Sequence, residues 1–442
     1  MKPSIIILAG GSGSRMCSTT PKVLHKICGK ELLFFSIQNA LQLSDDIHIV
    51  LYHQKELIRE YCQRTFAAHI DSQIHFHIQD YQNYPGTGGA ILQNQKLLHT
   101  KYPYLLILNA DMPLITPHSL QQFLHPSPIT LGVIRSHNPH GYGRIILQDN
   151  KVSAIVEEKD ATQQIKEIKT INSGVYLFSR EILEQYLPLL NNHNAQKEYY
   201  LPDIIKLAAK DGIEISPIIV EETEFGGINT KAQLTQAQEI LLAQLRHQAM
   251  LKGVTMHLPH SIYLDYDVQF EGECEIEQGV QLLGRTTIKH SHILAHSSIQ
   301  NSTIVQSSIG PFARIRPDCH ITDSHIGNFV EVKNSKLTAV KAGHLSYLGD
   351  CVIGEGSNIG AGVITCNYDG KKKHQTNIGK NVFVGSDCQL IAPVTIADHT
   401  LIAAGSTVSK DSQSGDLVIA RNPQKNIKDG FFAFFKSKKE QQ

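Results

Sequence analysis

The sequence lacks the features that mark nucleic-acid-binding, membrane-spanning or disulfide-stabilised proteins. Its 41 Lys and Arg residues are balanced by 41 Asp and Glu residues, so no bulk positive charge favours nucleic-acid binding. The eight cysteines form no Cys-x-x-Cys pair, which predicts free thiols in a reducing compartment and argues against a structural zinc site. No stretch approaches the roughly 18 apolar residues of a membrane span, and the apolar run at residues 5–9 is shorter than a signal-peptide core. We therefore expect a soluble, cytoplasmic protein without membrane insertion or nucleic-acid partners.

The most informative pattern present is a ladder of apolar residues at intervals of six. Its members are Ile378, Val384, Leu390, Ile396, Ile402 and Val408. Neither the period of an α-helix nor that of an ordinary strand gives this spacing, whereas a left-handed parallel β-helix with three six-residue sides per coil does. An ordinary all-β domain would require five consecutive intervals of six to arise by chance.

A looser ladder, with intervals of five or six, precedes the regular one. It comprises Ile288, Ile293, Ile299, Ile304, Ile309, Ile315, Ile321 and Ile326. The five-residue intervals are compatible either with tighter corners of the coil or with an imperfect register. In both cases the hexapeptide pattern predicts a β-helix for the second half of the chain.

The first half of the chain alternates strand-like and helix-like patterns. Short β-rich runs at residues 4–8, 47–52 and 104–108 are separated by amphipathic stretches, as an α/β fold requires. We expect a mostly parallel, doubly wound, Rossmann-like sheet. At 442 residues the chain is also long enough for two or three domains.

The boundary between the two halves is predicted to be helical. Leu234, Ala237, Leu241, Leu245 and Ala249 recur at helical spacing in a stretch free of Gly and Pro. The expected organisation is an α/β domain at residues 1–228, a linker helix at 229–251, and a β-helix with a C-terminal tail at 252–442.

A Gly-rich turn follows the first expected strand. It reads Gly10-Gly11-Ser12-Gly13-Ser14-Arg15-Met16, and Pro21-Lys22 comes after it. Its backbone N–H groups can approach phosphates, and its two cations can neutralise a triphosphate. The turn is neither a Walker A motif nor a Rossmann fingerprint, and taken alone it fits an ordinary αL turn equally well.

Asp111 is a second feature that supports a ligand-binding role for this turn. It lies just beyond the strand expected at residues 104–108, at the edge where open α/β sheets hold ligands. A carboxylate there can hold Mg²⁺ that bridges phosphates.

Together these strings resemble the nucleotidyltransferases that join a sugar 1-phosphate to a nucleoside triphosphate, whose opening is close to L-A-A-G-x-G-T-R-M followed by P-K. The resemblance extends over Gly86-Thr87-Gly88, Gly141-Tyr142-Gly143-Arg144, Val156-Glu157-Glu158-Lys159-Asp160, Asn172-Ser173-Gly174 and Gly227-Ile228-Asn229. Two departures are that Gly10-Gly11 replaces the commoner Ala-Gly, which the loop should tolerate, and that extra residues around Asn83-Tyr84-Pro85 precede Gly86.

This resemblance implies roles for individual residues. The implied nucleotide-sugar site comprises Leu8, Ala9, Gly10, Gly11, Lys22, Gln82, Gly86, Thr87, Gly143, Glu157, Asn172 and Asn229. Within that set, Gly143, Glu157 and Asn172 would line the sugar. Arg15 and Lys22 would stabilise charge at the α-phosphate as catalytic residues, and Asp111 with Asn229 would ligate Mg²⁺.

The β-helical half carries more specific strings. They are Lys341-Ala342-Gly343-His344-Leu345-Ser346-Tyr347, Asn358-Ile359-Gly360-Ala361 and Asn367-Tyr368-Asp369-Gly370-Lys371-Lys372-Lys373. With the first-half motifs, in the same order over nearly the whole chain, they resemble the bifunctional N-acetylglucosamine-1-phosphate uridylyltransferase/glucosamine-1-phosphate acetyltransferase family.

That second resemblance implies an acetyl-transfer site. His344 would be the general base, because a neutral imidazole can accept a proton near pH 7. The implied amino-sugar-phosphate site comprises Arg316, Lys333, Tyr347, Asn358 and Lys373. The implied acetyl-CoA site comprises Ala361, Asn367, Tyr368, Ser386, Ala404 and Arg421. A solvated turn remains the alternative interpretation of the lysines at residues 371–373.

The leading hypothesis is therefore an enzyme with two sequential activities. It would acetylate glucosamine 1-phosphate with acetyl-CoA and then transfer UMP from UTP to N-acetylglucosamine 1-phosphate, as a homotrimer with acetyl-transfer sites at subunit boundaries. One alternative is a different sugar-phosphate nucleotidyltransferase whose β-helix only oligomerises or regulates. Another is a scaffold with an inactive transferase domain, although the presence of Arg15, Lys22, Asp111 and Asn229 argues against it.

Overall fold

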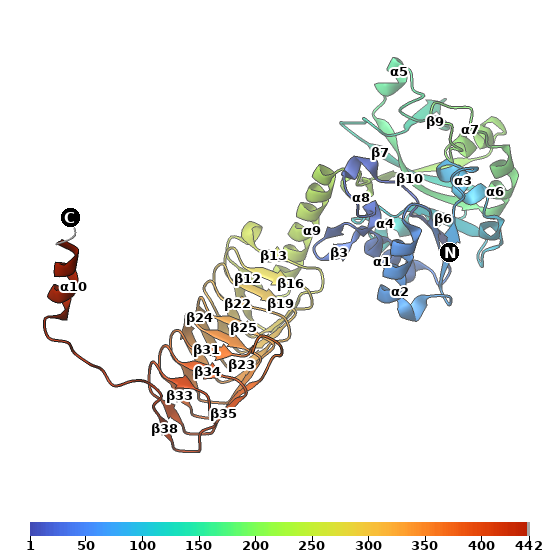
Figure 1. The fold of residues 1–442 in the computed structure, drawn as a ribbon. Coiled ribbons are helices and arrows are strands. Elements are labelled where there is room, and N and C mark those ends of the chain that lie inside the picture. Colours follow the sequence, from blue (N-terminus) through green and yellow to red (C-terminus); the bar gives the residue numbers. More distant parts are fainter. Residues whose placement is uncertain (440–442) are drawn as a thin grey trace. The chain divides into compact units, whose positions relative to one another are not determined.

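The computed structural model describes residues 1–439, and residues 440–442, at the end of the expected C-terminal tail, lie outside the described part. The chain divides into two compact units, Met1–Ala243 and Gln244–Gln442. The division falls inside helix α9 (Lys231–Leu251). Each unit is described by itself (Figure 1).

The first unit is built on a mixed β-sheet with the order β11-β7-β10-β6-β1-β4-β5. The strands of this path are β1 (Ser4–Leu8), β4 (Ile47–Leu51), β5 (Ile74–Ile78), β6 (Tyr104–Asn109), β7 (Ile129–Arg135), β10 (Thr170–Ser179) and β11 (Ile215–Val220). Strand β10 runs antiparallel to both of its neighbours, and the other pairs in the path are parallel. The expectation of a mostly parallel, Rossmann-like sheet is confirmed.

Helices and a short hairpin complete this unit. The helices are α1 (Leu32–Leu43), α2 (Lys55–Thr65), α3 (Gly86–Leu92), α4 (Pro117–Gln121), α5 (Gln163–Lys166), α6 (Arg180–Tyr186), α7 (Asp203–Lys210) and α8 (Glu222–Phe225). Strands β8 (Arg144–Gln148) and β9 (Lys151–Val156) form an antiparallel pair, and β8 also pairs with β10.

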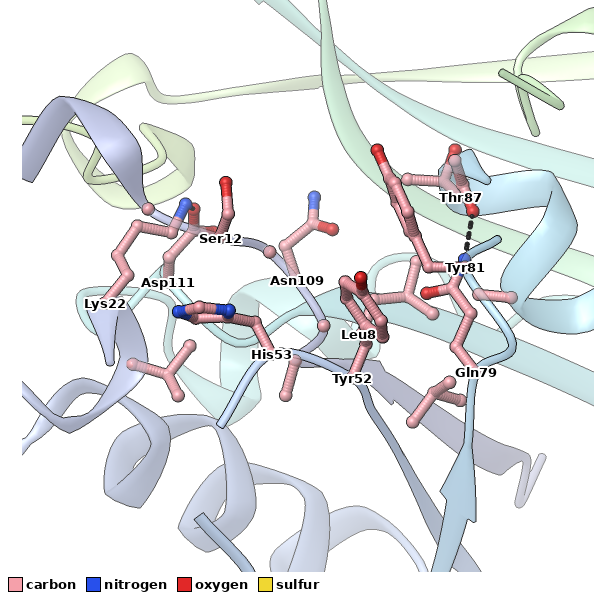
Figure 2. Close-up of a pocket in the computed structure, with 18 of the residues that line it drawn as sticks. Leu8, Ser12, Lys22, Tyr52, His53, Gln79, Tyr81, Thr87, Asn109 and Asp111 are labelled. Atoms are coloured by element: carbon pink, nitrogen blue, oxygen red, sulfur yellow. Dashed lines mark hydrogen bonds and ion pairs between the residues drawn. The ribbon is translucent and has the colours of Figure 1, made fainter. Parts of the chain in front are cut away.

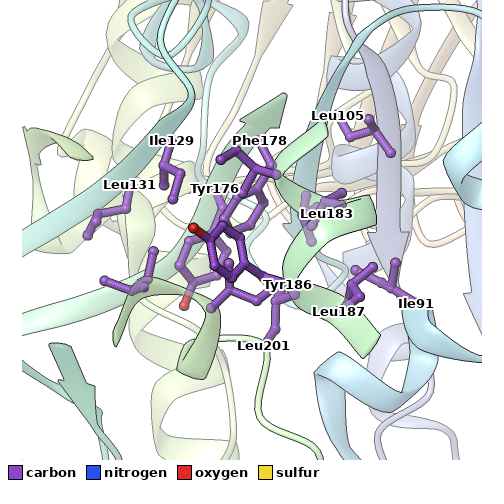
Figure 3. Close-up of a cluster of buried hydrophobic side chains, with 14 of the residues drawn as sticks. Ile91, Leu105, Ile129, Leu131, Tyr176, Phe178, Leu183, Tyr186, Leu187 and Leu201 are labelled. Carbon is purple, nitrogen blue, oxygen red and sulfur yellow. The ribbon is translucent and has the colours of Figure 1, made fainter. Parts of the chain in front are cut away.

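The core of this unit lies between the sheet and the helices that follow β5 and β10. Side chains from β6, β7 and β10 pack there against α6, with Phe178 and Leu183 fully buried (Figure 3). Tyr176 and Phe178 stack with ring centroids 5.6 Å apart. Because burying each such side chain contributes about 1.5–3 kcal/mol, this cluster holds the strand ends in fixed positions.

The second unit is a left-handed parallel β-helix whose strands form three flat faces. The first face comprises β12 (Val254–Met256), β15 (Cys274–Ile276), β18 (His292–Ile293), β21 (Ser308–Ile309), β24 (His325–Asn328), β27 (Lys341–His344), β30 (Asn358–Ile359), β33 (Phe383–Val384), β36 (Leu401–Ile402) and β38 (Leu417–Val418). The second comprises β13 (Tyr263–Leu264), β16 (Gln281–Leu283), β19 (Ser298–Gln300), β22 (Arg314–Ile315), β25 (Glu331–Lys333), β28 (Tyr347–Gly349), β31 (Ile364–Cys366), β34 (Gln389–Ile391) and β37 (Thr407–Val408). The third comprises β14 (Gln269–Glu271), β17 (Thr287–Lys289), β20 (Thr303–Val305), β23 (His320–Thr322), β26 (Lys336–Thr338), β29 (Cys351–Ile353), β32 (Thr376–Ile378) and β35 (Val394–Ile396).

The six-residue ladder explains these faces. Its members lie in β32, β33, β34, β35, β36 and β37 in turn, so successive residues project from successive faces into the interior. All six are at most 3% exposed. The predicted β-helix is therefore confirmed.

The looser ladder reflects tighter corners rather than a lost register. Ile288 pairs with Ile304 and Ile304 with Ile321 in the third face, while Ile293 pairs with Ile309 in the first. Because these isoleucines stay directly above one another, the missing residue of each five-residue interval is removed from a corner. One further helix, α10 (Gly430–Lys439), follows the coil.

Candidate functional site

A pocket of about 570 Å³ opens at the carboxyl ends of the central strands of the first unit. Leu8 and Asn109 end β1 and β6, Tyr52 follows β4, and all three line it (Figure 2). The edge of an open parallel sheet formed by strand carboxyl ends is where such folds bind ligands. Of the predicted nucleotide-sugar residues, the pocket brings together Leu8, Ala9, Gly10, Gly11, Lys22, Gly86, Thr87 and Asn229, and also the predicted Arg15 and Asp111.

The Gly-rich turn is held against Lys22. Gly13 has φ +63°, and a Cβ built on it would lie 2.8 Å from the Lys22 Cβ. A side chain at position 13 would therefore both strain the backbone and push Lys22 away. Met16, which is 1% exposed, anchors the end of the turn. This packing places Arg15 and Lys22 on the same pocket.

Lys22 joins the two residues predicted to bind metal. Its Nζ forms an ion pair with the carboxylate of Asp111 and donates a hydrogen bond of 3.2 Å to Asn229 Oδ1. The side chains of Lys22 and Asp111 are only 14% and 13% exposed, so the pair is shielded from solvent. The backbone N–H of Asn229 is bound by Gln233 Oε1 at 2.8 Å, which ties this residue to the first turn of α9.

Gln79, rather than the predicted Gln82, occupies the far end of the pocket. Gln79 follows β5 directly, is 6% exposed and lines the pocket. Its Nε2 donates hydrogen bonds of 2.9 Å to the carbonyls of both Tyr84 and Gly86. Both amide hydrogens are thus engaged within the protein, and Oε1 is left as an acceptor beside Gly10.

The expectation for Gln82 is not supported by its position. Gln82 is exposed and lies outside the residues that line the pocket. The extra residues before Gly86 fold into a turn in which the Tyr84 N–H donates to the Asp80 carbonyl at 2.8 Å. This turn carries Gln82 away from the strand end and leaves Gln79 there. The sequence signal for Gln79 is its place immediately after a strand.

The three predicted sugar residues form their own group. The Asn172 N–H donates to the Gly143 carbonyl at 2.9 Å, and a Cβ on Gly143 would lie 3.1 Å from Glu157 Oε1. Glu157 borders a separate hollow with Asp160 and Asp203. Burial, with smaller effects of those two carboxylates, raises the pKa of Glu157 to about 7. The group does not line the pocket described above.

In the second unit, His344 belongs to a column of corner residues. Ala342 pairs with Ile359, Ile359 with Val384, and Val384 with Ile402 in the first face. The residues two positions further on therefore occupy equivalent corners of successive coils; they are His344, Ala361, Ser386 and Ala404.

Backbone hydrogen bonds join the coils along this column. The Asp387 N–H donates to the Ala361 carbonyl at 2.8 Å, and the Gly405 N–H donates to the Ser386 carbonyl at 2.9 Å. Arg421 continues the column beyond β38, with its Cδ 4.0 Å from a Cβ built on Gly405. The predicted base and four of the predicted acetyl-CoA residues thus lie along one edge of the coil.

Cations gather at another corner of the coil, where the second face ends at Arg316 and Lys333. The pKa of Lys333 is lowered, chiefly by the neighbouring Lys373 amino group and also by Arg316. Arg316 donates a hydrogen bond of 3.0 Å to Glu331. Such crowding of like charges is unfavourable unless an anion is bound.

A short hairpin brings Lys373 to this position. Tyr368 forms an antiparallel bridge with Lys373, and Asp369 accepts hydrogen bonds of 2.7 and 2.6 Å from the backbone N–H groups of Lys371 and Lys372. His374 pairs with Asp369 at 2.7 Å. These contacts give the hairpin a defined shape.

The remaining predicted residues hold the base of the hairpin or lie on the first face. The Asn367 side chain donates to the carboxylate of Asp350 and approaches the Tyr347 hydroxyl at 3.5 Å. Tyr368 is 61% exposed. Asn358 lies in β30, in register with Lys341.

No helix in the described residues is long and apolar enough to cross a membrane. Likewise, within residues 1–439 no group of three or more His, Cys, Asp or Glu side chains has an arrangement that could hold a metal ion.

Comparison with known proteins agrees with both units. A family model described as nucleotidyl transferase matches residues 4–223, and one described as bacterial transferase hexapeptide (six repeats) matches residues 375–410. Similar proteins named "Bifunctional protein GlmU" occur in Nitratiruptor sp., at 55% identity over 98% of this chain and 99% of that protein, and in Helicobacter hepaticus, at 54% identity over 100% and 99%. The protein of that name in Wolinella succinogenes is 52% identical over 99% of this chain and 100% of its own length. The resemblance noted in the sequence is thereby confirmed, and the chain belongs to the family of the bifunctional GlmU proteins.

Proposed function

We propose that this chain acetylates glucosamine 1-phosphate with acetyl-CoA and then transfers UMP from UTP to N-acetylglucosamine 1-phosphate. The products are UDP-N-acetylglucosamine and pyrophosphate. The first reaction belongs to the β-helix, at residues 252–442, and the second to the α/β domain, at residues 1–228, with the helix at 229–251 as the linker. The observation that carries the proposal is that one chain holds both a cationic pocket at strand ends and a corner column that includes His344.

The uridylyl transfer requires positioning and charge stabilisation more than proton transfer. A phosphate oxygen of the sugar phosphate attacks the α-phosphorus of UTP, and the bond to the leaving pyrophosphate breaks. Arg15 and Lys22 lie on the same pocket and would offset the negative charge that develops there. The attacking oxygen is already an anion, so this chain needs no general base for the step.

The residues of this pocket fit Mg²⁺. Asp111 and Asn229 both approach Lys22 Nζ, so a carboxylate and an amide oxygen converge at one point. Mg²⁺ prefers oxygen ligands and commonly takes one or two from protein, with phosphate oxygens and water completing its shell. When bound, the ion would neutralise phosphate charge.

Gln79 supplies a basis for nucleotide selection. Its amide hydrogens are bound to backbone carbonyls, so Oε1 is the atom that it can offer to a base. An acceptor matches the N3–H of uracil, whereas the unprotonated N3 of cytosine would meet another acceptor and leave both unpaired. This fixed orientation favours UTP over CTP.

For acetyl transfer, the amine of glucosamine 1-phosphate attacks the thioester carbonyl. His344 removes a proton from the attacking nitrogen, and the carbon–sulfur bond breaks to release CoA. Lys333, Lys373 and Arg316 would bind the phosphate. Acetyl-CoA would extend along Ala361, Ser386, Ala404 and Arg421, with Asn367 and Tyr368 beside it.

The assembly proposed is a homotrimer in the cytoplasm. An exposed apolar ridge next to the corner column supports self-association. Phe312, Phe329 and Leu345 are 48%, 58% and 63% exposed, and the two rings stack at 5.4 Å. Contiguous exposed apolar surface of this kind usually marks an interface. Sedimentation of the purified chain would measure its mass in solution.

Two assays on the purified chain test the function. CoA release from acetyl-CoA plus glucosamine 1-phosphate, and pyrophosphate release from UTP plus N-acetylglucosamine 1-phosphate, are both expected. Pyrophosphate release without CoA release would instead indicate a nucleotidyltransferase whose β-helix is structural. Absence of both products would indicate a scaffold.

A further inference from the structure

Two tyrosines that the sequence motifs do not include form one wall of the nucleotide pocket. Tyr52 follows β4, and Tyr81 lies in the turn after β5, at the carboxyl ends of two neighbouring parallel strands. Their rings stack with centroids 4.8 Å apart and an interplanar angle of 17°. Both residues line the pocket, and they lie beside Gln79 (Figure 2).

Gly10 makes room for this wall. A Cβ built on Gly10 would lie 3.2 Å from the Tyr52 Cβ and 3.1 Å from Gln79 Oε1. The commoner Ala at this position of the turn would crowd both residues. Gly10 is thus explained by the close approach of Tyr52, and the turn, Gln79 and the tyrosine pair are packed as one group.

An acidic residue that also lines the pocket binds Tyr81. The Tyr81 hydroxyl donates a hydrogen bond of 2.7 Å to Glu198 Oε1. Burial, and secondly this hydrogen bond, raises the pKa of Tyr81 to about 12, so the hydroxyl remains a donor at neutral pH. Tyr52 stacks on a ring that cannot easily rotate, yet it keeps 39% of its own surface exposed.

We propose that the stacked pair Tyr52 and Tyr81 is the platform on which the nucleobase of the nucleoside triphosphate packs. This inference rests on the proposed uridylyl transfer and extends it, because it names the residues that hold the ring of the base. Gln79 then reads the edge of the base, and the tyrosine wall binds its face.

The physical basis is the exposed aromatic surface beside a hydrogen-bond acceptor. A base ring stacks favourably on an aromatic side chain, and losing one such stack weakens binding by about ten- to a hundredfold. The triphosphate end of the pocket, at Arg15 and Lys22, is formed by other residues. The platform should therefore affect affinity for the nucleotide and leave affinity for the sugar phosphate unchanged.

Steady-state kinetics of pyrophosphate release test the platform. Tyr52→Ala is expected to raise the KM for UTP at least tenfold with the KM for N-acetylglucosamine 1-phosphate unchanged, while Tyr52→Phe retains the wild-type KM for UTP. A KM for UTP within twofold of wild type in Tyr52→Ala would overturn the proposal. So would an equal rise of both KM values together with a lowered Tm, because a purely structural role predicts that pattern.

A double-mutant cycle tests the link to Gly10. Gly10→Ala should raise the KM for UTP in the wild-type background and have little further effect in Tyr52→Ala, since the residue it crowds is absent. Additive effects would contradict the packing of these residues as one group.

A fluorescence experiment tests direct contact. The chain contains no tryptophan, so Tyr52→Trp introduces a single reporter at the wall. UTP should quench its emission with saturation, and inorganic tripolyphosphate should not. Equal quenching by the two, or no quenching by UTP in a variant that still releases pyrophosphate, would refute base stacking. If the wild-type chain released no pyrophosphate, the proposed function itself would fail, which is a different outcome from either result.

Discussion

His344 and Ala361 occupy equivalent corners of adjacent coils. Each lies two residues beyond a member of the register pair Ala342 and Ile359. The same relationship continues to Ser386 and Ala404 in the next two coils. A parallel β-helix repeats such corners about every 4.8 Å along its axis, so a long, thin ligand can lie along the column with its reactive end at His344.

The column predicts the effect of filling a corner. Ala404→Phe places a large ring on an exposed corner, so the fold should tolerate it while the path of acetyl-CoA is blocked. The KM for acetyl-CoA should rise at least about tenfold, equivalent to about 1.4 kcal/mol, with pyrophosphate release unchanged. Thr395→Phe, on an exposed strand position of the third face, is the matched control and should leave both reactions intact. An equal loss in both variants would contradict the column.

The crowded cations predict a role for one particular lysine. Lys373→Ala removes the main cause of the lowered pKa of Lys333 and one charge-assisted contact to phosphate. The KM for glucosamine 1-phosphate should rise about tenfold or more, as measured by CoA release. Lys371→Ala, in the same hairpin, is the control. If both variants behaved like wild type, the lysines would form only a solvated turn.

Glu157 predicts a pH-dependent stability. Its pKa is about 7 in the folded chain and near 4.5 when unfolded. Between pH 4.5 and pH 7 the folded state therefore keeps a proton on Glu157 that the unfolded state has lost. Stability is therefore lost as pH rises from about 4.5 to 7. Glu157→Gln removes this loss, and its Tm relative to wild type should increase by a few °C between pH 5 and pH 8. A Tm difference independent of pH in thermal unfolding would show that the carboxyl is not buried as described.

The sequence predicts the β-helix well because burial alone sets its period. Ile378 and Val384 project inward from different faces, and only a residue count of six per side brings both inside. The five-residue intervals after Ile288 cannot be interpreted from spacing alone. A shorter corner and a shifted strand register would both reduce the interval between apolar residues from six to five. The paired isoleucines distinguish them.

The candidate sites were predicted less evenly. Asp111 and Lys22 are found from motifs and strand ends, but their ion pair depends on long-range packing. Gln82 lies outside the pocket, because the extra residues before Gly86 form a turn that carries it away from the strand end, where Gln79 remains. The stack of Tyr52 on Tyr81 joins two loops that no local pattern connects.

The central claim is that one chain holds two independent catalytic sites, and reciprocal variants test it most directly. CoA release is measured from acetyl-CoA plus glucosamine 1-phosphate, and pyrophosphate release is measured separately from UTP plus N-acetylglucosamine 1-phosphate. In these assays, His344→Ala should abolish acetyl transfer and retain uridylyl transfer, while Asp111→Ala should do the reverse. An equimolar mixture should convert glucosamine 1-phosphate, acetyl-CoA and UTP to UDP-N-acetylglucosamine, because the intermediate can diffuse between chains. Loss of both activities in either variant, in a chain that remains folded and of unchanged mass, would contradict the account.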